Sequence, residues 1–600
     1  MSLVAEKSAS ANGSNDIKDA VIRLAGNSQD GIQTVGGFLA RLAGRSAQEV
    51  MTYMTIPSTI SGGASIFQVR IGSGEVLSPG DEADFLIAFY QDSYENHLSA
   101  LRDGGVCLYD SDHVEPDTSD KRFTFIGVPM TSTTVEAIGG SARDRGKNIF
   151  VLGLLTKLFE LDRDKLVRII EAQFKRKHES VLRNAMLAFD SGYAYETGDV
   201  FSHSYAFEPG EAVEDNRITT DGNTALTYGL LAAGVRYGAG YPITPWSSIM
   251  ETLRSELPKY GGTFIQSEDE LAAISSAIGF SYAGHIAVTG SSGPGLSLKM
   301  EALGYACMAE LPIIVVNVQR GGPSTGLPTS VEQSDLMQAI YGSHGDSPRV
   351  ILAPKDVEDC YYIAIEACRI AKEYSTPVII LTDQSLSSRI EAFPEPDISD
   401  VKEPELDLKI QPSEFRPYPL DSQTKHAPPG SKMAEGKYPV VTGLEHDEWG
   451  HPSSNPELHQ KMTNRRRDKI KKLASSLSKL EIYGDNEGEV LLIGWGSTWG
   501  PIREAVDTAK RNNQKVSSIH LRHIHPMPNG IDEIIENFNS AIVVEMNDEG
   551  LYGYGQLATL LRARYSNPKI SSLTKTNGLG FKISEILEGI ENAKQLTNLV

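Results

Sequence analysis

The sequence YPITP at residues 241–245 combines residue types that could bind an anion. Pro242 and Pro245 flank Ile243 and Thr244. They favour an extended, rigid turn, because proline fixes its own φ and disfavours helical backbone at the preceding residue. A helical pattern follows, so the turn presents the Thr244 hydroxyl at a helix N-terminus, where negative charge is favoured. A simple capping turn is the alternative that the residues leave open.

A second polar segment, QSEDE at residues 266–270, begins another helical pattern rich in Ala, Ser and Gly. The three carboxylates of Glu268, Asp269 and Glu270 could simply complement the partial positive charge of a helix N-terminus. Alternatively, one of them lies in a buried cleft and hydrogen-bonds a cofactor nitrogen. The residues by themselves are compatible with both interpretations.

Arg320 follows a long apolar run. Residues 313–318 predict a buried strand, and a loop rich in Gly and Pro, QRGGPSTGLPT, occupies residues 319–329. An arginine at the end of such a strand can bind a carboxylate through two parallel hydrogen bonds. Ligands of α/β proteins also collect at this end of the strands.

Two glycine-rich turns join predicted strands to helices, at residues 26–31 (GNSQDG) and 289–297 (TGSSGPGLS). The first is not G-x-G-x-x-G, because Ser28 stands at the third position, and the second lacks the G-K-[ST] of a nucleoside-triphosphate loop. Glycines here could let backbone N–H groups face a phosphate at a helix N-terminus. A purely structural turn is the competing interpretation.

The elements that must position these segments alternate between strands and helices. Near-continuous apolar strands between helices are typical of parallel sheets covered on both faces. Strands are expected at residues 17–25, 66–71, 83–88, 123–128, 286–288, 313–318, 350–352, 378–381, 490–496, 516–520 and 541–545. Helices are expected at residues 35–42, 148–159, 163–176 and 225–233. We therefore expect a multi-domain α/β chain with a disordered tail at 1–16 and domains at 17–205, 206–392 and 489–600.

A connection at residues 393–488 interrupts the α/β pattern. Nine of the 30 prolines lie between Phe393 and Pro439, which predicts a long irregular segment along the protein surface. Residues 457–480 then read as a helix with an apolar stripe. Its basic residues predict a solvated helix face, with an anion or partner contact as the alternative. These residues are Arg465, Arg466, Arg467, Lys469, Lys471 and Lys472.

Composition excludes several classes of protein. The 600 residues include 56 Lys plus Arg and 78 Asp plus Glu, a formal charge of 56 − 78 = −22, which disfavours broad nucleic-acid binding. The four cysteines show no C-x-x-C spacing, so neither a disulfide framework nor an iron–sulfur or Cys-zinc site is expected on this chain. No segment has the length and hydrophobicity of a signal peptide or a membrane span, and a cytoplasmic location is expected.

Taken together, these motifs resemble the alpha subunits of 2-oxoacid:ferredoxin oxidoreductases in which a gamma-type domain precedes the alpha part. The resemblance rests on residues 241–245, 266–270, 289–297 and 319–329 in that order. Residues 442–448 (TGLEHDE) are similar to the 2-oxoglutarate type. In the C-terminal part, VEMN at 544–547 and GQL at 555–557 also match, although an insertion at 548–554 separates them. The resemblance extends over nearly all of residues 17–600.

This resemblance implies a gamma-type domain, a pyrimidine-binding domain of a thiamine diphosphate enzyme and a transketolase C-terminal-like domain. It implies that Glu268 bonds the aminopyrimidine ring of the cofactor and promotes its imino tautomer, with Glu270, two residues later in the sequence, as the alternative. It also implies that Thr244 and Arg320 bind the 2-oxoacid carboxylate. The cofactor-binding residues that it implies are Glu268, Tyr241, Pro242, Ile243, Thr244 and Pro245.

The chain has no Gly-Asp-Gly, the start of the motif with which thiamine enzymes hold magnesium diphosphate. The resemblance therefore implies a beta subunit that carries the diphosphate, Mg²⁺ and a [4Fe–4S] cluster, in a heterotetramer of two alpha and two beta subunits. Ferredoxin and CoA are the other expected partners, and no metal ligand is assigned to this chain.

The activity implied by the resemblance is thiamine-dependent oxidative decarboxylation of a 2-oxoacid, with 2-oxoglutarate favoured, to an acyl-CoA and CO₂ with reduction of ferredoxin. Pyruvate or a branched-chain 2-oxoacid are alternative substrates. A thiamine-dependent decarboxylase or synthase without electron transfer, and a non-catalytic scaffold subunit, are the competing classes.

Overall fold

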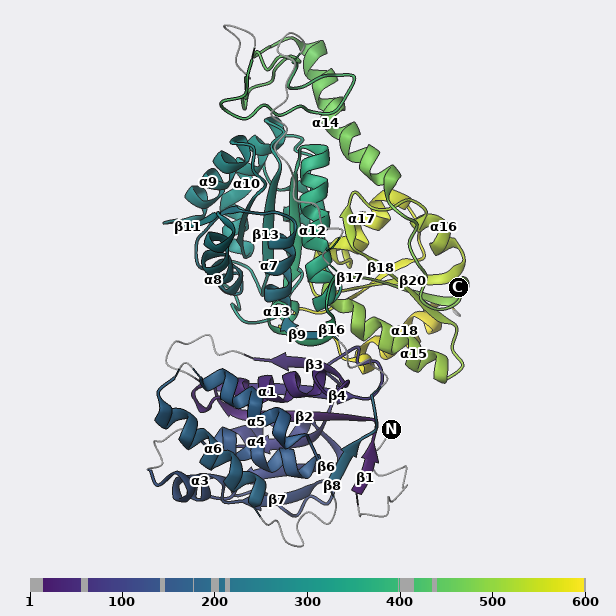
Figure 1. The fold of residues 1–600 in the computed structure, drawn as a ribbon. Coiled ribbons are helices and arrows are strands. Elements are labelled where there is room, and N and C mark those ends of the chain that lie inside the picture. The colour runs from purple at the N-terminus through teal and green to yellow at the C-terminus, as the bar shows by residue number, and fades with distance from the viewer. Residues whose placement is uncertain are drawn as a thin grey trace. The chain divides into compact units, whose positions relative to one another are not determined.

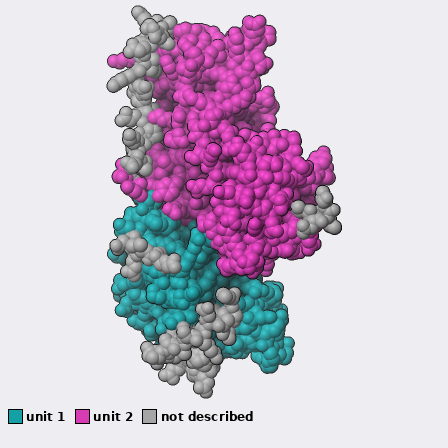
Figure 2. All heavy atoms as spheres, turned by 90° about the vertical axis from the view of Figure 1, so that its right-hand side faces the viewer, with its two compact units in different colours: residues 1–220, 388–396 teal, residues 221–387, 397–600 magenta. Residues whose placement is uncertain are grey.

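The protein is described here by a computed structural model that covers residues 14–55, 63–140, 146–175, 177–195, 204–210, 216–397, 399, 415–433 and 440–597. The chain forms two compact units, coloured separately in Figure 2. Unit 1 comprises residues 1–220 and 388–396, and unit 2 comprises residues 221–387 and 397–600. Most of the expected N-terminal tail, residues 1–13, lies outside the described residues. Its last residues form a strand instead, because β1 (Ser14–Ile17) pairs in parallel with β8 (Ser204–Phe207).

Unit 1 contains an eight-stranded sheet with the order β7-β6-β5-β2-β4-β3-β16-β9. Every residue of the interior strand β5 is buried. The strands are β2 (Asp19–Asn27), β3 (Glu49–Met54), β4 (Ala64–Gly72), β5 (Ala83–Ala88), β6 (Leu101–Asp110), β7 (Thr124–Val128), β9 (Arg217–Asp221) and β16 (Ile390–Pro394).

Buried apolar side chains of α1, α3, α4, α5 and α6 form one core with the sheet, whereas Tyr94 of α2 lies in a second apolar cluster. Figure 1 shows helices of unit 1 lying against its sheet. α4 is apolar on all sides and almost entirely buried, as expected of a helix inside the core. The helices are α1 (Ile32–Gly44), α2 (Gln91–His97), α3 (Met130–Ile138), α4 (Lys147–Leu158), α5 (Arg163–Phe174) and α6 (Glu179–Ala194).

Unit 1 does not end near residue 205, where the sequence pattern placed the boundary. It continues to Thr220 and also includes residues 388–396, which the sequence pattern divides between the next domain (206–392) and the connection (393–488). β16 joins the sheet because Glu391 pairs with Met51 and the Ile390 N–H donates to Thr52 Oγ1 at 2.8 Å. These partners lie more than 300 residues apart in the sequence, so a local pattern does not reveal the pairing.

Unit 2 contains a seven-stranded sheet with the order β11-β10-β12-β13-β15-β14-β19, in which only β19 runs antiparallel to its neighbour. The strands are β10 (Tyr237–Gly240), β11 (Thr263–Gln266), β12 (Ala287–Ser291), β13 (Ile313–Gln319), β14 (Val350–Leu352), β15 (Pro377–Asp383) and β19 (His523–His525). The accompanying helices are α7 (Gly222–Ala232), α8 (Ser247–Glu256), α9 (Glu270–Tyr282), α10 (Gly293–Met308), α11 (Leu336–Tyr341), α12 (Val357–Tyr374) and α13 (Gln384–Ser388).

The C-terminal part of unit 2 forms a four-stranded parallel sheet with the order β18-β17-β20-β21. Its strands are β17 (Gly488–Trp495), β18 (Val516–Leu521), β20 (Phe538–Glu545) and β21 (Ile570–Thr574). Its helices are α15 (Trp499–Arg511), α16 (Ile531–Glu536), α17 (Gln556–Tyr565) and α18 (Ile583–Thr597). None of the described helices is long and apolar enough to cross a membrane.

The connection is irregular where it is described, at residues 395–397, 399, 415–433 and 440–455. The segment at 393–439 was expected to run along the protein surface, and this is correct only in part. Phe415 and Tyr418 are buried, and the Tyr418 hydroxyl donates to the carbonyl of Ala309. Residues 398, 400–414 and 434–439 lie outside the described residues. Figure 1 shows α14 (Pro456–Ser476) extending from this irregular segment toward the C-terminal sheet.

The expectation of a solvated basic face on α14 is wrong for half of its residues. The guanidinium of Arg465 and the ammonium of Lys469 both bind the carboxylate of Glu310, which is 1% exposed. Arg466 is also buried and binds both oxygens of Glu445, at 3.1 and 2.8 Å. Arg467 is half-exposed and binds Asp468. The basic run therefore anchors the connection, because a buried charge needs a counter-ion.

Candidate active site at the carboxyl ends of four parallel strands

The four polar segments singled out from the sequence all begin at one edge of the sheet in unit 2. They follow β10, β11, β12 and β13, which are neighbours in the order β11-β10-β12-β13 and run parallel. The carboxyl ends of parallel neighbours lie at the same edge, which is where α/β proteins bind ligands.

The turn after β10 is held by a buried amide. Asn223 on α7 donates through Nδ2 to the carbonyl of Pro245 at 2.9 Å and to Ser248 Oγ at 2.8 Å. Pro245 is buried, whereas the side chains of Tyr241 and Thr244 are exposed, and no side chain caps α8. The Thr244 hydroxyl is therefore presented outward and does not cap the helix. Sequence reasoning missed Asn223, since nothing local links it to residues 241–245.

The segment after β11 separates its three carboxylates into different environments. Asp269 is the helix cap, because its Oδ1 accepts the Ala272 N–H at 2.8 Å. Glu270 is the first residue of α9 and is 7% exposed, and its backbone carbonyl accepts from Lys299 Nζ at 2.9 Å. Glu268 is exposed. Asp269 is also exposed but caps α9, whereas Glu268 does not, so a ligand outside this chain can reach the Glu268 carboxylate.

Lys299 is buried beside this segment. Burial lowers its pKa to about 8, an effect that the neighbouring Glu270 and Asp269 oppose. Close packing also explains a glycine of the third motif: a Cβ on Gly295 would lie 1.9 Å from Ser291 Oγ and 2.7 Å from Glu270 Oε1. The turn after β12 thus needs Gly295 for the approach of α10 to α9.

Buried hydroxyls gather at this edge. The hydroxyl oxygens of Ser267, Thr289, Ser291 and Ser292 are buried and have no hydrogen-bond partner within the described part of the chain. An unpaired buried polar group costs about 1–3 kcal/mol, so a bound group or water that pairs with these hydroxyls is favoured. Together with the exposed Glu268 carboxylate, they fit the nitrogen-rich ring of an aminopyrimidine.

Arg320 links the segment after β13 (residues 319–329) to the segment after β10 (residues 241–245) by a hydrogen bond. The residue is 6% exposed, and its guanidinium donates from Nη1 to the carbonyl of Thr244 at 2.6 Å and from Nη2 to the carbonyl of Thr325 at 3.2 Å. Burial lowers its pKa, which Asp335 partly opposes. A guanidinium has five N–H donors, so Arg320 keeps donors for an anion beyond these two contacts. Within the described residues, no hydrogen bond links Glu268 to Arg320 or to Thr244.

The two parts of the C-terminal motif, residues 544–547 and 555–557, contact each other in the structure although the insertion at 548–554 separates them in the sequence. The insertion at 548–554 loops out, and the backbone N–H groups of Leu557 and Ala558 donate to the buried Glu545 at 2.7 and 3.0 Å. Asn547 accepts from the Gln556 N–H and donates to the carbonyl of Gln333. This network packs the C-terminal sheet against the segment that follows Arg320, so it positions the site without lining it.

Residues 442–448 have structural contacts. Glu445 binds Arg466 and His459, and the buried His446 ring lies 4.1 Å from the ring of Tyr418. Although burial opposes it, Arg466 and His459 lower the pKa of Glu445 to about 2. This motif therefore holds the connection together in the described structure.

In unit 1, the turn at residues 26–31 contains the short 3₁₀ helix Ser28–Asp30 before α1. Asp30 accepts from the Asn27 N–H and from the Tyr90 hydroxyl, both at 3.0 Å. Gly31 has a φ of +71° and accepts a hydrogen bond from Asn148 Nδ2 through its carbonyl. These contacts account for the turn as a structural element.

Comparison with known proteins defines the class. Residues 228–465 match the family "Pyruvate flavodoxin/ferredoxin oxidoreductase, thiamine diP-bdg", residues 21–195 match "Pyruvate ferredoxin/flavodoxin oxidoreductase", and residues 488–586 match "Pyruvate:ferredoxin oxidoreductase core domain II". The fold and site therefore define a multi-domain α/β oxidoreductase subunit with a thiamine diphosphate-binding domain, as the sequence predicted.

Individual relatives narrow this class. The chain is 36% identical to 2-oxoglutarate oxidoreductase subunit KorA of Mycobacterium tuberculosis, over 95% of this chain and 91% of that one. It is 29% identical to subunit alpha of 2-oxoacid:ferredoxin oxidoreductase 1 of Aeropyrum pernix, over 96% and 97% of the two chains. A solved 2-oxoglutarate:ferredoxin oxidoreductase of Magnetococcus marinus, with 2-oxoglutarate, coenzyme A and succinyl-CoA bound, superposes with a TM-score of 0.89 at 34% identity, covering 96% of this chain and 100% of that chain. The chain belongs to the alpha subunits of the 2-oxoacid:ferredoxin oxidoreductases.

Proposed function

We propose that this chain, together with a partner subunit, converts 2-oxoglutarate and CoA to succinyl-CoA and CO₂ and passes two electrons, one at a time, to two molecules of ferredoxin. The observation that carries the proposal is the placement of the four motifs at one sheet edge, with Arg320 bonded to the Thr244 carbonyl at 2.6 Å. The 2-oxoglutarate named for the Mycobacterium and Magnetococcus proteins supports this substrate.

Thiamine diphosphate would supply the carbanion that attacks the 2-oxo carbon. Glu268 would hydrogen-bond the aminopyrimidine ring and hold the proton that its imino tautomer requires. Tyr241, Pro242, Ile243 and Pro245 would shape the wall against the cofactor. The exposed Glu268 and the outward Tyr241 support a ring bound at an open edge of this chain.

Arg320 and Thr244 would bind the carboxylate next to the 2-oxo group. The guanidinium is buried, so its remaining N–H groups act in a medium of low dielectric, where a charged hydrogen bond is strong. Its bond to the Thr244 backbone carbonyl at 2.6 Å brings the two residues together, and we infer that the threonine hydroxyl contacts the same anion. Both residues thus hold the substrate for attack without taking part in proton transfer.

A beta subunit would complete the site. The chain has no Gly-Asp-Gly, and its four cysteines are buried free thiols without C-x-x-C spacing. The diphosphate, Mg²⁺ and a [4Fe–4S] cluster are therefore assigned to the partner, in a heterotetramer of two alpha and two beta subunits. The exposed motif residues support a site that closes only when a second chain covers it.

The test is a substrate panel on the purified complex of this chain with its partner, with reduction of ferredoxin as the readout. We expect reduction with 2-oxoglutarate and CoA, and at least tenfold lower kcat/KM with pyruvate or a branched-chain 2-oxoacid. Equal or better use of pyruvate would contradict the proposed substrate. Activity of this chain alone would contradict the shared site, and aldehyde release without an electron acceptor would contradict the redox reaction.

A further inference from the structure

Lys299 is a buried cation next to the motif at 266–270, and the proposed reaction leaves it without a role. It lies on α10 with 0% of its surface exposed, and its Nζ donates to the backbone carbonyl of Glu270 at 2.9 Å. Across the described residues, its ammonium makes no other hydrogen bond and has no carboxylate within ion-pair distance. A backbone carbonyl and more distant charges therefore hold this cation in place.

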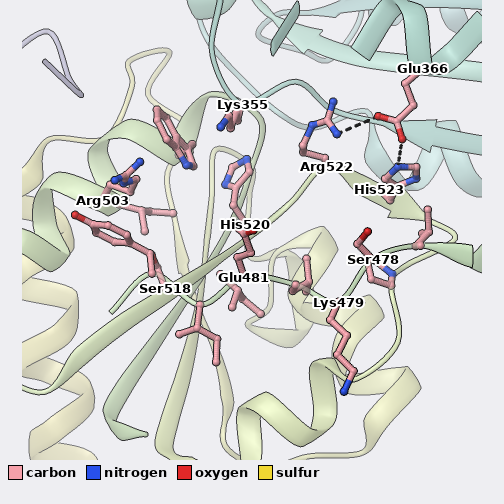
Figure 3. A pocket seen from close by; sticks show the side chains of 18 of the residues that line it. Lys355, Glu366, Ser478, Lys479, Glu481, Arg503, Ser518, His520, Arg522 and His523 are labelled. Carbon is pink, nitrogen blue, oxygen red and sulfur yellow. Dashed lines mark hydrogen bonds and ion pairs between the residues drawn. The ribbon is translucent and has the colours of Figure 1, made fainter. Parts of the chain in front are cut away.

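Arg522 and Lys469, by contrast, contact carboxylates directly. Figure 3 shows Arg522 in a pocket with Glu366, to which its Nη1 donates at 3.0 Å. On α14, Lys469 Nζ lies 2.7 Å from a carboxylate oxygen of Glu310. Taking a charge out of water without such a partner is costly, so ion pairing does not explain why Lys299 is buried.

Fold stability does not explain an ammonium at this position either. Glu270 is the first residue of α9, so its carbonyl already belongs to the hydrogen-bond ladder of the helix. Burial lowers the pKa of Lys299 to about 8 against the opposing effect of Glu270 and Asp269, so the charge persists at neutral pH at a cost. Apolar replacement of buried charges is often neutral or stabilising. The charge is therefore expected to serve the segment that Lys299 contacts.

That segment carries three successive carboxylates. Asp269 caps α9 through the N–H of Ala272, and Glu268 is exposed. Glu270 is 7% exposed, and none of the described residues forms a hydrogen bond or an ion pair with its carboxylate. Negative charges in such close succession repel one another. Lys299, whose charge interacts with those of Glu270 and Asp269, offsets this repulsion from inside the protein.

The approach of α10 to α9 brings Lys299 to this segment. Gly295 and Lys299 lie four residues apart on α10, on the same face of the helix. A Cβ at Gly295 would lie 1.9 Å from Ser291 Oγ and 2.7 Å from Glu270 Oε1, so the two helices meet there without an intervening side chain. One turn further along α10, Lys299 reaches the Glu270 carbonyl. The start of α9 is therefore fixed to α10 by a steric contact and a hydrogen bond, two residues after Glu268.

We propose that Lys299 is a positioning residue for Glu268. Its hydrogen bond anchors the first carbonyl of α9, and its charge stabilises the carboxylates at 268–270 from behind, so that the Glu268 carboxylate is held at the sheet edge for a nitrogen of the cofactor ring. This role rests on the proposed function, in which Glu268 bonds the aminopyrimidine of thiamine diphosphate. Lys299 acts through these carboxylates and takes no part in the reaction itself.

The test compares Lys299→Met with wild type in the complex of this chain and its partner, loaded with thiamine diphosphate. Methionine has a similar length but neither the charge nor the donor. We expect kcat to fall at least about tenfold while the KM values for 2-oxoglutarate and CoA stay within about twofold, because only the cofactor-bonding carboxylate is disturbed. A thermal midpoint within about 2 °C of wild type serves as the folding check.

A second readout, independent of activity, follows the cofactor ring. Its imino tautomer gives a circular-dichroism band whose pH midpoint reports the proton affinity of the ring. A positive charge nearby disfavours the protonated ring, so Lys299→Met should raise this midpoint by at least about 0.5 pH unit. Lys299→Gln keeps an N–H donor without the charge and should show the same rise. The charged side chains that face Lys299, those of Glu270 and Asp269, are unchanged in both variants.

The matched control is Lys157→Met on α4 of unit 1. Lys157 is exposed, and its Nζ donates to the backbone carbonyl of Tyr195 at 3.0 Å, which is the same kind of hydrogen bond. Since this lysine lies outside the site, its replacement should leave kcat and the pH midpoint of the band as in wild type.

Unchanged kcat and pH midpoint in Lys299→Met and Lys299→Gln would overturn the proposal. A lower kcat with an unchanged midpoint in both variants would overturn it too, because local disorder alone gives that result. If Glu268→Gln kept wild-type turnover, the proposed function of Glu268 would fail, and the role of Lys299 with it. Loss of turnover in Glu268→Gln but not in the Lys299 variants would leave the proposed function intact and restrict Lys299 to a structural role.

Discussion

Glu310 should hold the connection onto unit 2 through its charge. Its carboxylate is 1% exposed and binds Arg465, Lys469 and Thr424, with Lys469 Nζ at 2.7 Å. Burial alone would raise the pKa of Glu310, but Lys469 and Arg465 hold it below its ordinary value. Glu310→Gln keeps the shape and removes the charge, which leaves two cations that are 8% and 10% exposed without their counter-ion. Breaking a buried ion pair in this way costs about 3–5 kcal/mol.

Hydrogen exchange of the amides of α14 measures this cost locally, since the helix can open without global unfolding. A loss of about 3–5 kcal/mol corresponds to roughly 100- to 4,000-fold faster exchange. The matched control is Asp468→Asn on the same helix, whose partner Arg467 is half-exposed. An exposed pair is worth about 0.2–1 kcal/mol, so exchange should rise less than about sixfold.

If exchange in Glu310→Gln rose no more than in Asp468→Asn, the charge of Glu310 would not be what holds α14 in place. A triple variant separates charge from packing: replacing Glu310, Arg465 and Lys469 together by methionine removes every charge of the cluster. Apolar replacement of a buried ion cluster is often neutral, so exchange should return to within about tenfold of wild type. A triple variant as unprotected as Glu310→Gln would mean that lost hydrogen bonds, and not unpaired charge, cause the effect.

Three further outcomes follow from the site and its supports. Arg320→Ala should lower kcat/KM for the 2-oxoacid at least about tenfold with little change in the KM for CoA, and a change within about twofold, roughly 0.4 kcal/mol, would exclude the carboxylate role. Asn223→Ala removes the bonds to the Pro245 carbonyl and to Ser248 Oγ; it should lower stability by about 1–2 kcal/mol and raise the KM for the 2-oxoacid, whereas an unchanged KM would separate Asn223 from the site. The pKa of Glu366 falls from 4.5 to about 2 on folding, so its contribution, on the order of 2–3 kcal/mol, is present above pH 4.5 and is lost as the pH falls toward 2. Glu366→Gln should therefore flatten the pH dependence of the thermal midpoint in that window, and a variant as steep as wild type would contradict the assignment.

The strands that precede the candidate site residues could be predicted where a run of apolar residues indicates a buried strand. The run at 313–318 is apolar at most positions, and β13 is buried throughout, so Arg320 was expected at the end of a buried strand. β10 and β11 were missed, because YGAG and TFIQ are four residues long and show neither an apolar run nor clear alternation. Their polar successors, at 241–245 and 266–270, were nevertheless recognisable by residue type.

Long-range partners explain what sequence patterns could not predict. Nothing near Arg465 indicates that Glu310, 155 residues earlier, supplies its counter-ion, so the basic run read as a solvated face. The apolar stripe also predicts a helix that is too long at its C-terminal end. The helix was expected to reach residue 480, but α14 ends at Ser476, and Leu477 and Leu480 lie in the irregular segment that follows. Likewise, the choice between Glu268 and Glu270 depends on burial, which adjacent carboxylates in one motif do not reveal.

The most direct test of the central claim, a thiamine site at the open sheet edge, compares Glu268→Gln with Glu270→Gln in the complex of this chain and its partner. The measurement is the rate of ferredoxin reduction with saturating 2-oxoglutarate and CoA. We expect Glu268→Gln to lower the rate at least about 1,000-fold with an unchanged thermal midpoint, and Glu270→Gln to keep most of the activity. Near wild-type turnover in Glu268→Gln, with activity lost in Glu270→Gln, would contradict this claim.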